Sequence, residues 1–183
     1  YRAGEAEAFD ALVRRYRNEL FHFLIRFMGK RAAAEDVFQN TFIQVHRSLD
    51  TFDTDRRFKP WLFTIAANKG RDFMRKQKRR PTVPLSAPVS GGKEDGQDFV
   101  DLMQADLPMP DERMEDEELR EKVRAAVEAM PDHLREILLL AYFEKLPYAE
   151  IADVLGIPLG TVKSRLHTAV GQFAEKWKIA NPE

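Results

Sequence analysis

An acidic stretch rich in proline and glycine divides the chain near its middle. Residues 81–111 contain five of the ten prolines, a pair of adjacent glycines, and six acidic side chains against one basic side chain. Such a composition is typical of a linker, because it offers too little apolar surface to offset the entropy lost on folding. We therefore expect two folded parts, residues 1–80 and residues 112–183, joined by a flexible connection.

Both parts show the spacing of apolar side chains that marks one face of an α-helix. Residues 1–80 are predicted to form three long helices, the first ending at Gly29 and the third starting near Phe58 and stopping before Pro81. Residues 112–183 are predicted to form four helices, and no β-strand alternation is found. The expected fold class is all-α: two small helical domains joined by the acidic linker.

Composition excludes several classes of protein. The chain of 183 residues has no cysteine, so disulfide frameworks and thiolate metal or redox sites are excluded. Its longest apolar or aromatic run, Ile137 to Phe143, is far shorter than the roughly 20 residues that span a membrane. No charged-then-apolar signal segment opens the sequence. We expect a cytoplasmic protein that does not insert into a membrane.

The net charge of −1 hides a strong asymmetry along the chain. Residues 1–80 carry 18 basic and 10 acidic side chains, whereas residues 81–122 carry 4 basic and 12 acidic ones. The excess of positive charge in the first part indicates an anionic partner, with uneven solvation charge as the alternative explanation.

The C-terminal part contains the spacing of a helix-turn-helix. Ala152, Gly156 and Val162 provide a small residue at the helix crossing, a glycine for the turn, and a branched apolar residue that anchors the second helix. The opposite face of that second helix places small polar side chains at its centre and Lys163 and Arg165 on its flanks. This arrangement suits base edges in the middle and phosphates at the sides. A structural helix pair with a solvated outer face is the alternative.

The third predicted helix ends in a run of basic side chains, and further basic residues with aromatic neighbours precede it. Cations mixed with aromatic rings can hold a strand backbone and stack unpaired bases. Trp61, however, has the spacing of a core residue. The stripe of Asn68, Asp72 and Arg75 fits either a structural polar network or a ridge that reads bases.

The second predicted helix has a polar outer face with the apolar Ile43 at its centre. Single exposed apolar residues are common. Because Asp36, Gln39, Asn40 and Gln44 frame this one, the face is a candidate protein-contact surface.

Three segments in this order resemble an extracytoplasmic-function sigma factor, a small two-domain bacterial transcription initiation factor. Residues 34–42 resemble the helix that binds the polymerase clamp. Residues 58–68, with Asp72 and Arg75, resemble the segment that recognises and melts the −10 promoter element. Residues 148–166 resemble the helix-turn-helix that reads the −35 element. The resemblance covers nearly the whole chain.

The resemblance implies an all-α protein that binds core RNA polymerase and promoter DNA, with sigma domain 2 at residues 1–80 and sigma domain 4 at residues 112–183. The residues expected to bind the −10 element are Arg56, Arg57, Lys59, Asn68, Arg71, Arg75, Lys76 and Arg79. The residues expected to bind the −35 element are Thr161, Lys163, Ser164, Arg165, His167 and Thr168. The residues expected to bind polymerase are Asp36, Gln39, Asn40, Ile43, Gln44 and Arg47.

The family also implies an anti-sigma factor as a partner, in a stress or envelope signal response. No catalytic residue, metal, cofactor or small-molecule substrate is expected. The four histidines lack metal-ligand spacing, and no Gly-x-Ser-x-Gly elbow is present.

Two further interpretations stay open. One is a two-domain helix-turn-helix regulator that does not bind polymerase. The other concerns regulation: the acidic linker could fold back on the basic first domain and mask its DNA surface.

Overall fold

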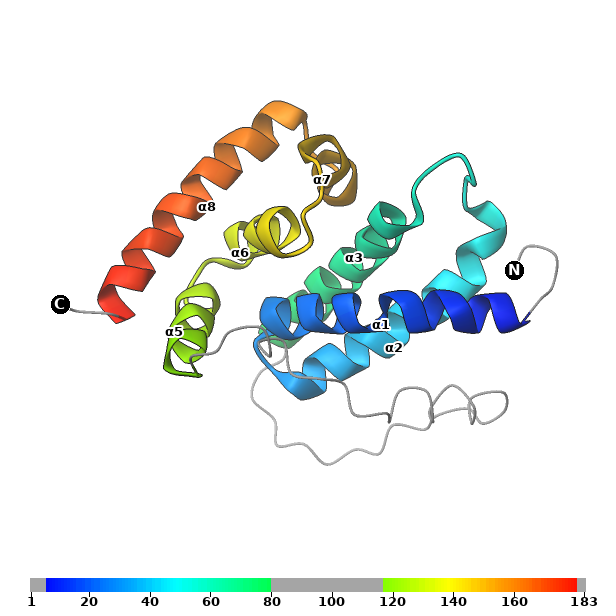
Figure 1. Cartoon of the computed structure of the whole chain (residues 1–183), viewed down its shortest axis with the longest axis horizontal. Coiled ribbons are helices and arrows are strands. Elements are labelled where there is room, and N and C mark those ends of the chain that lie inside the picture. The colour runs from blue at the N-terminus through cyan, green and yellow to red at the C-terminus, as the bar shows by residue number, and fades with distance from the viewer. Residues whose placement is uncertain (1–5, 80–116, 181–183) are drawn as a thin grey trace.

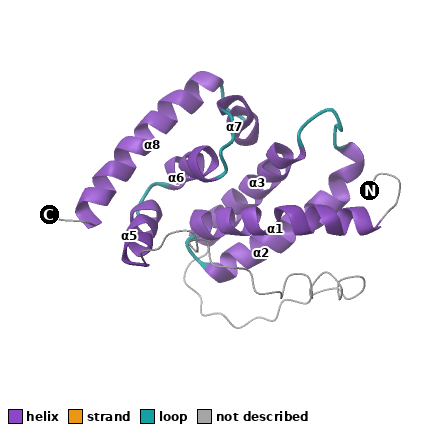
Figure 2. Cartoon of the chain, in the orientation of Figure 1, coloured by secondary structure: helices purple, strands orange, loops and turns teal. Residues whose placement is uncertain are grey.

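A computed structural model describes residues 6–79 and 117–180, and every regular element in these ranges is helical (Figures 1 and 2). This confirms the all-α fold class. The predicted linker, residues 81–111, lies outside the described residues, and so does the hypothesis that it covers the first domain.

The N-terminal bundle consists of the three predicted long helices. They are α1 (Ala6–Met28), α2 (Arg31–Ser48) and α3 (Phe58–Arg79), with a short 3₁₀ turn at Leu49–Thr51. Gly29 ends α1 in the left-handed conformation at φ 68°, and its N–H donates to the carbonyl of Ile25 at 2.9 Å. Phenylalanines fill the interior: Phe23 packs against Phe63 with ring centroids 5.2 Å apart and against Phe27 at 5.5 Å. The aromatic core therefore ties α1 to α3.

The C-terminal bundle contains the four predicted helices and one irregular turn. These elements are α5 (Glu117–Glu128), α6 (Asp132–Leu138), the π-turn η2 (Leu139–Phe143), α7 (Tyr148–Leu155) and α8 (Leu159–Ala180). Helix α6 runs directly into η2, where the N–H of Glu144 donates to the carbonyl of Leu139 at 3.0 Å.

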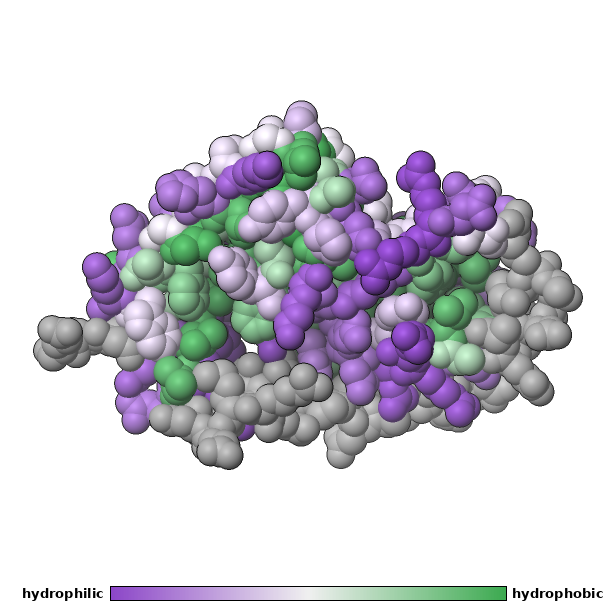
Figure 3. Space-filling view, turned by 45° about the horizontal axis from the view of Figure 1, so that its top comes forward, coloured by the Kyte–Doolittle hydropathy of each residue, from purple (hydrophilic) through white to green (hydrophobic). Residues whose placement is uncertain are grey.

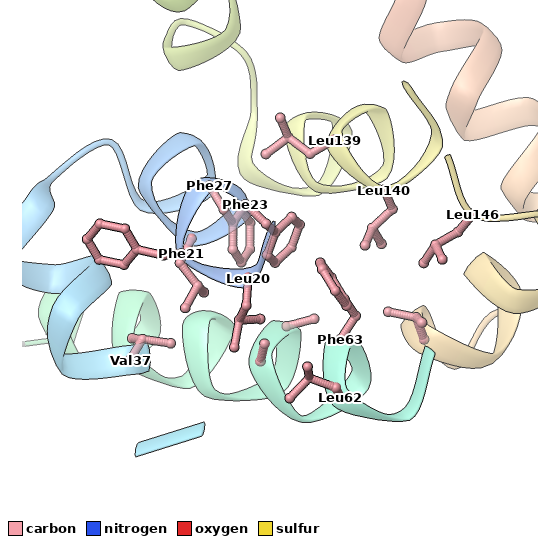
Figure 4. Packing of buried hydrophobic residues seen from close by; sticks show 14 of the residues in the cluster. Leu20, Phe21, Phe23, Phe27, Val37, Leu62, Phe63, Leu139, Leu140 and Leu146 are labelled. Carbon is pink, nitrogen blue, oxygen red and sulfur yellow. The ribbon is translucent and has the colours of Figure 1, made fainter. Parts of the chain in front are cut away.

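The two bundles pack against each other and share one hydrophobic core. Leu140 and Leu146 point from the C-terminal bundle toward the space beside Phe63 of the N-terminal bundle, and Leu139 belongs to the same buried cluster (Figure 4). Leu139, Leu140, Phe23 and Phe63 are all completely buried. The two predicted helical domains are thus present, but in this structure they are joined by tertiary packing as well as by the chain.

Helices α1 and α3 lie close together at Gly70. A Cβ atom at this position would lie 2.8 Å from Cε1 of Phe27, whose ring is fully buried and cannot move aside. We expect Gly70→Ala to destabilise the protein by about 1–3 kcal/mol through overpacking, in spite of the higher helix propensity of alanine. Chemical denaturation measures the change.

Gly171 provides the matched control, because it lies in α8 and a Cβ atom added there would meet no other atom within 4 Å. Gly171→Ala should stabilise the protein by about 0.5–1 kcal/mol. Equal effects of the two substitutions would contradict the close approach of α1 and α3.

Candidate nucleic-acid and polymerase interfaces

The residues expected to bind the −10 element lie on α3 and in the loop before it. Arg56 and Arg57 are exposed in the loop, Lys59 lies half-buried in the first turn of α3, and Arg75 is exposed near its end. The remaining four residues also lie in α3: Asn68, Arg71, Lys76 and Arg79. An array of cations along one helix can follow a nucleic-acid backbone.

Aromatic rings gather at the start of this surface. Trp61 lies 4.8 Å from Phe52 and 5.6 Å from Phe58 between ring centroids, and Tyr16 lies 5.3 Å from Phe58. Trp61 is only partly exposed and packs against the core, which agrees with its core spacing. The cluster fixes the direction in which α3 leaves the loop.

The stripe of Asn68, Asp72 and Arg75 has local partners. Arg71 donates to Oδ1 of Asn68 at 2.5 Å, and Arg75 donates to Oδ1 of Asp72 at 2.6 Å. These contacts form a polar network along α3, and the exposed side chains of Asn68 and Asp72 remain at its surface.

Three of the expected −10 residues are paired with carboxylates of the C-terminal bundle. Arg57 contacts Glu150 at 2.6 Å, and Arg71 contacts Glu136 at 3.2 Å. Lys59 contacts Glu144 at 3.2 Å and donates to the backbone carbonyl of the same residue at 3.1 Å. The part of the expected −10 site formed by Arg57, Lys59 and Arg71 is therefore in contact with the second bundle. A band of strongly hydrophilic side chains crosses the middle of the molecule between the two bundles (Figure 3).

Two of these carboxylates are buried, at 4% exposure of the Glu136 side chain and 5% of the Glu144 side chain. Burial raises the pKa of Glu136 to about 7, an effect that outweighs the attraction of Arg71. Burial likewise raises the pKa of Glu144 to about 7, in spite of the nearby ammonium of Lys59. Each pair therefore consists of a cation and a carboxyl that is only partly ionised near neutral pH.

The helix-turn-helix is formed by α7 and α8. Gly156 ends α7 in the left-handed conformation at φ 63°, and the N–H of Ile157 donates to the carbonyl of Ala152 at 3.0 Å, closing the turn. Val162 is completely buried and anchors α8 against α7. The predicted roles of Gly156 and Val162 in the geometry of this unit agree with the structure.

The outer face of α8 carries the residues expected to bind the −35 element. Lys163, Ser164, His167 and Thr168 are exposed. The hydroxyl of Thr168 donates to the carbonyl of Ser164 at 3.1 Å and leaves the oxygen lone pairs available. Two of the expected residues, Thr161 and Arg165, are half-buried at the edge of this face.

The outer face of α2 carries the residues expected to bind polymerase. Ile43 is 44% exposed, and four of the polar residues are exposed around it: Asp36, Gln39, Asn40 and Arg47. Gln44 differs from these, because its amide donates to Ser48 at 2.8 Å and accepts from Lys69 of α3 at 3.2 Å. Gln44 thus also helps to hold α2 on α3.

The carboxylates that face α3 were not predicted from the sequence. Glu136 lies between Leu134 and Ile137, and Glu144 directly follows the apolar run that ends at Phe143. An acid inside or beside such a run is a signal of a buried ion pair, because charged residues are rarely buried without partners. The identity of the partner depends on how the bundles meet.

Within the described ranges, no three histidine, aspartate or glutamate side chains lie close enough together to hold a metal ion. None of the helices described here has an apolar stretch long enough to cross a bilayer.

Comparisons with known proteins match both parts of the chain. Residues 12–80 match the family Sigma-70 region 2, and residues 120–172 match the family Sigma-70, region 4. The chain is 34% identical over 164 residues to the ECF RNA polymerase sigma factor SigW of Bacillus subtilis, covering 90% of this chain and 86% of the relative. It is 35% identical over 167 residues to the RNA polymerase sigma-H factor of Pseudomonas aeruginosa, covering 91% and 84%.

Two solved structures resemble the fold. The structure of CnrH in complex with the cytosolic domain of CnrY has a TM-score of 0.65 at 25% identity and covers 95% of this chain and 90% of that one. The sigma factor RpoE in complex with the anti-sigma factor NepR from Bartonella quintana has a TM-score of 0.68 at 23% identity and covers 96% and 100%.

The raised pKa of Glu136 makes stability depend on pH. The folded state favours the protonated carboxyl, so this contribution to stability is fully present below the unfolded pKa of about 4.5 and is lost as pH rises through about 7. We expect Glu136→Gln, which is neutral at every pH, to flatten the fall in the free energy of unfolding between pH 5 and pH 8. Its stability relative to the unmodified chain should be greatest at pH 8. Denaturant titrations across this range measure the effect.

Glu121 is 61% exposed and pairs only loosely with Arg124 of the same helix, at 3.5 Å. Glu121→Gln should leave the pH dependence of the free energy of unfolding unchanged. A steeper pH dependence in Glu136→Gln would show that attraction to Arg71, and not burial, controls this carboxyl.

Proposed function

The chain belongs to the extracytoplasmic-function family of RNA polymerase sigma factors, and we propose that it acts through three separate surfaces. As a sigma factor it binds core RNA polymerase, directs it to specific promoters and promotes DNA opening. In this role the protein supplies binding surfaces that position the polymerase, and the polymerase catalyses RNA synthesis. We infer that the chain itself is not an enzyme and that it works in the cytoplasm, where polymerase and promoters are.

The domain boundaries that we propose are residues 1–80 for sigma domain 2 and residues 112–183 for sigma domain 4, with residues 81–111 as the linker. Matches to region 2 and region 4 on either side of the linker support this division.

For domain 2 we propose that α3 and its preceding loop bind the −10 element. The observation that supports this most directly is that all eight expected residues lie along one helix and its entry loop. The cations would neutralise backbone phosphates, while Asn68 offers an amide to an unpaired base.

For domain 4 we propose that α8 enters the major groove at the −35 element. The left-handed turn at Gly156 and the buried anchor at Val162 leave Lys163, Ser164 and His167 exposed on one face. Small polar groups at the centre can approach base edges, and Lys163 can contact a phosphate.

For regulation we propose that an anti-sigma factor holds the chain inactive. Solved structures that resemble this chain contain CnrH with the cytosolic domain of CnrY and RpoE with NepR, and these neighbours support the proposal.

Transcription in vitro tests the function as a whole. Purified core RNA polymerase is incubated with a promoter library, with and without the chain, and transcript start sites are sequenced. We expect initiation at a distinct set of promoters that share a −10 and a −35 motif and depend on the chain. Start sites that do not change when the chain is added would overturn the assignment.

The α2 surface has a sharper test. Because Ile43 is the exposed apolar centre of this face, Ile43→Asp should abolish binding to core RNA polymerase, measured by pull-down, while the thermal unfolding midpoint stays unchanged. Ile179→Asp makes the same change at a residue that is 74% exposed at the end of α8, and it should bind normally. Normal binding by Ile43→Asp would reject the surface and favour a helix-turn-helix regulator that works without polymerase.

A further inference from the structure

A chain of hydrogen bonds joins the middle of α3 to the end of α2. The ammonium of Lys69 donates to Oε1 of Gln44 at 3.2 Å, and Nε2 of Gln44 donates to Oγ of Ser48 at 2.8 Å. The backbone carbonyl of Ser48 accepts from the hydroxyl of Thr51 at 2.7 Å. The chain therefore runs from α3, through the end of α2, to the 3₁₀ turn that leads into the loop before α3.

This hydrogen-bond chain connects elements of both candidate surfaces of the N-terminal bundle. Gln44 belongs to the face of α2 that is expected to bind polymerase. Lys69 directly follows Asn68 of the expected −10 site, and Thr51 precedes the loop that holds the first residues of that site. A change at one end of the chain can therefore reach both surfaces.

The buried faces of α2 and α3 are otherwise largely apolar. Phe42 and Val45 on α2 and Leu62 and Ala66 on α3 belong to one buried cluster. Apolar contacts are not directional, so they allow one helix to shift slightly along the other. A hydrogen bond has a preferred distance and angle, so the contact of Lys69 with α2 favours one alignment of the two helices.

The ammonium also determines which way the Gln44 amide faces. A lysine ammonium can only donate hydrogen bonds, so the carbonyl oxygen of the amide has to face it, and the NH₂ group is then directed at Ser48. Lys69 is half-buried and directed at α2, whereas Arg75 and Lys76 of the same helix are exposed. Its contact is thus with the neighbouring helix and differs from the exposed cations of the −10 surface.

We propose that Lys69 is a positioning residue that couples the polymerase surface on α2 to the −10 surface on α3 by fixing the Gln44 amide and the end of α2. This inference rests on the proposed functions of α2 and α3. In this role Lys69 contacts neither polymerase nor DNA. It holds the two surfaces in one relative orientation, so that polymerase bound on α2 carries α3 to the promoter correctly aligned.

The first test separates polymerase binding from promoter opening. Opening by the complex of core RNA polymerase and the chain is followed by the fluorescence of 2-aminopurine in the −10 element of a promoter recovered from the library. Lys69→Met keeps a long side chain but cannot donate. We expect it to slow opening about three- to tenfold, a factor that corresponds to about 0.7–1.4 kcal/mol. Its affinity for core polymerase, measured by pull-down titration, should change far less, because Ile43 and the polar residues around it remain.

Lys178→Met is the matched control, because Lys178 is exposed in the last turn of α8 and the change in charge is the same. It should open the promoter at the rate of the unmodified chain. Equal rates for Lys69→Met and Lys178→Met would overturn the proposal. So would a loss of polymerase affinity by Lys69→Met that equals its loss of opening rate.

The second test shows whether Lys69 acts through Gln44. Gln44→Met removes the partner of the ammonium, so Lys69→Met should slow opening no further when it is added to Gln44→Met. Effects that multiply in the double variant would show that the two residues act independently, and they would overturn the proposal.

A direct contact between Lys69 and DNA would give a different result. A cation that neutralises one phosphate contributes about one to the slope of log affinity against log salt concentration. Lys69→Met should leave this slope unchanged for promoter binding by the polymerase complex. A decrease of about one would assign Lys69 to the DNA surface instead of a positioning role.

Denaturant titration checks that the variants fold. Gln44 is only half-buried, so water can replace the ammonium, and Lys69→Met should unfold at the same denaturant concentration as the unmodified chain. If it does not fold, Ser48→Ala breaks the same chain at its next hydrogen bond, and a normal opening rate in that variant would overturn the proposal. An unmodified chain that opens no promoter would reject the proposed function itself, which keeps the two failures distinct.

Discussion

The apolar packing of Leu140 and Leu146 beside Phe63 of α3 is the contact on which the arrangement of the whole molecule depends. It lies within the one hydrophobic core that the two bundles share, and it determines which polar groups lie opposite each other at the margin. The π-turn Leu139–Phe143 carries Leu140, which is completely buried. Without this contact, the acidic groups of residues 132–150 and the cations of α3 would each face water.

The same contact places charge and apolar surface in competition. Apolar burial favours the closed arrangement, whereas Glu136 and Glu144 lose hydration in it. Ion pairs at such sites offset part of the free energy that the carboxylates lose on dehydration. They also fix how the two bundles align with each other. The balance suits the proposed function, in which the two proposed DNA-binding surfaces reach promoter elements about two turns of duplex apart, roughly 70 Å. For this the bundles have to separate.

Much of the fold and of the sites could be predicted from local pattern. The helix spacing identified all the long helices, and Gly29 and Gly156 marked two of the turns because both adopt positive φ. The exposed face of α8 and the exposed Ile43 followed from helical periodicity alone. Gln44 could not be assigned fully in this way, because its second contact comes from Lys69, 25 positions along the chain.

The sequence by itself determined two helical units, their periodic faces and the sign of their charge, since each depends on residues within a few turns of one another. Only the tertiary structure decided that the basic edge of α3 lies against carboxylates of the other bundle. The pairing of Arg57 with Glu150 spans 93 positions, and no local pattern encodes it. It arises because two apolar surfaces, one on each bundle, exclude water by meeting, and the charges around them are then brought together.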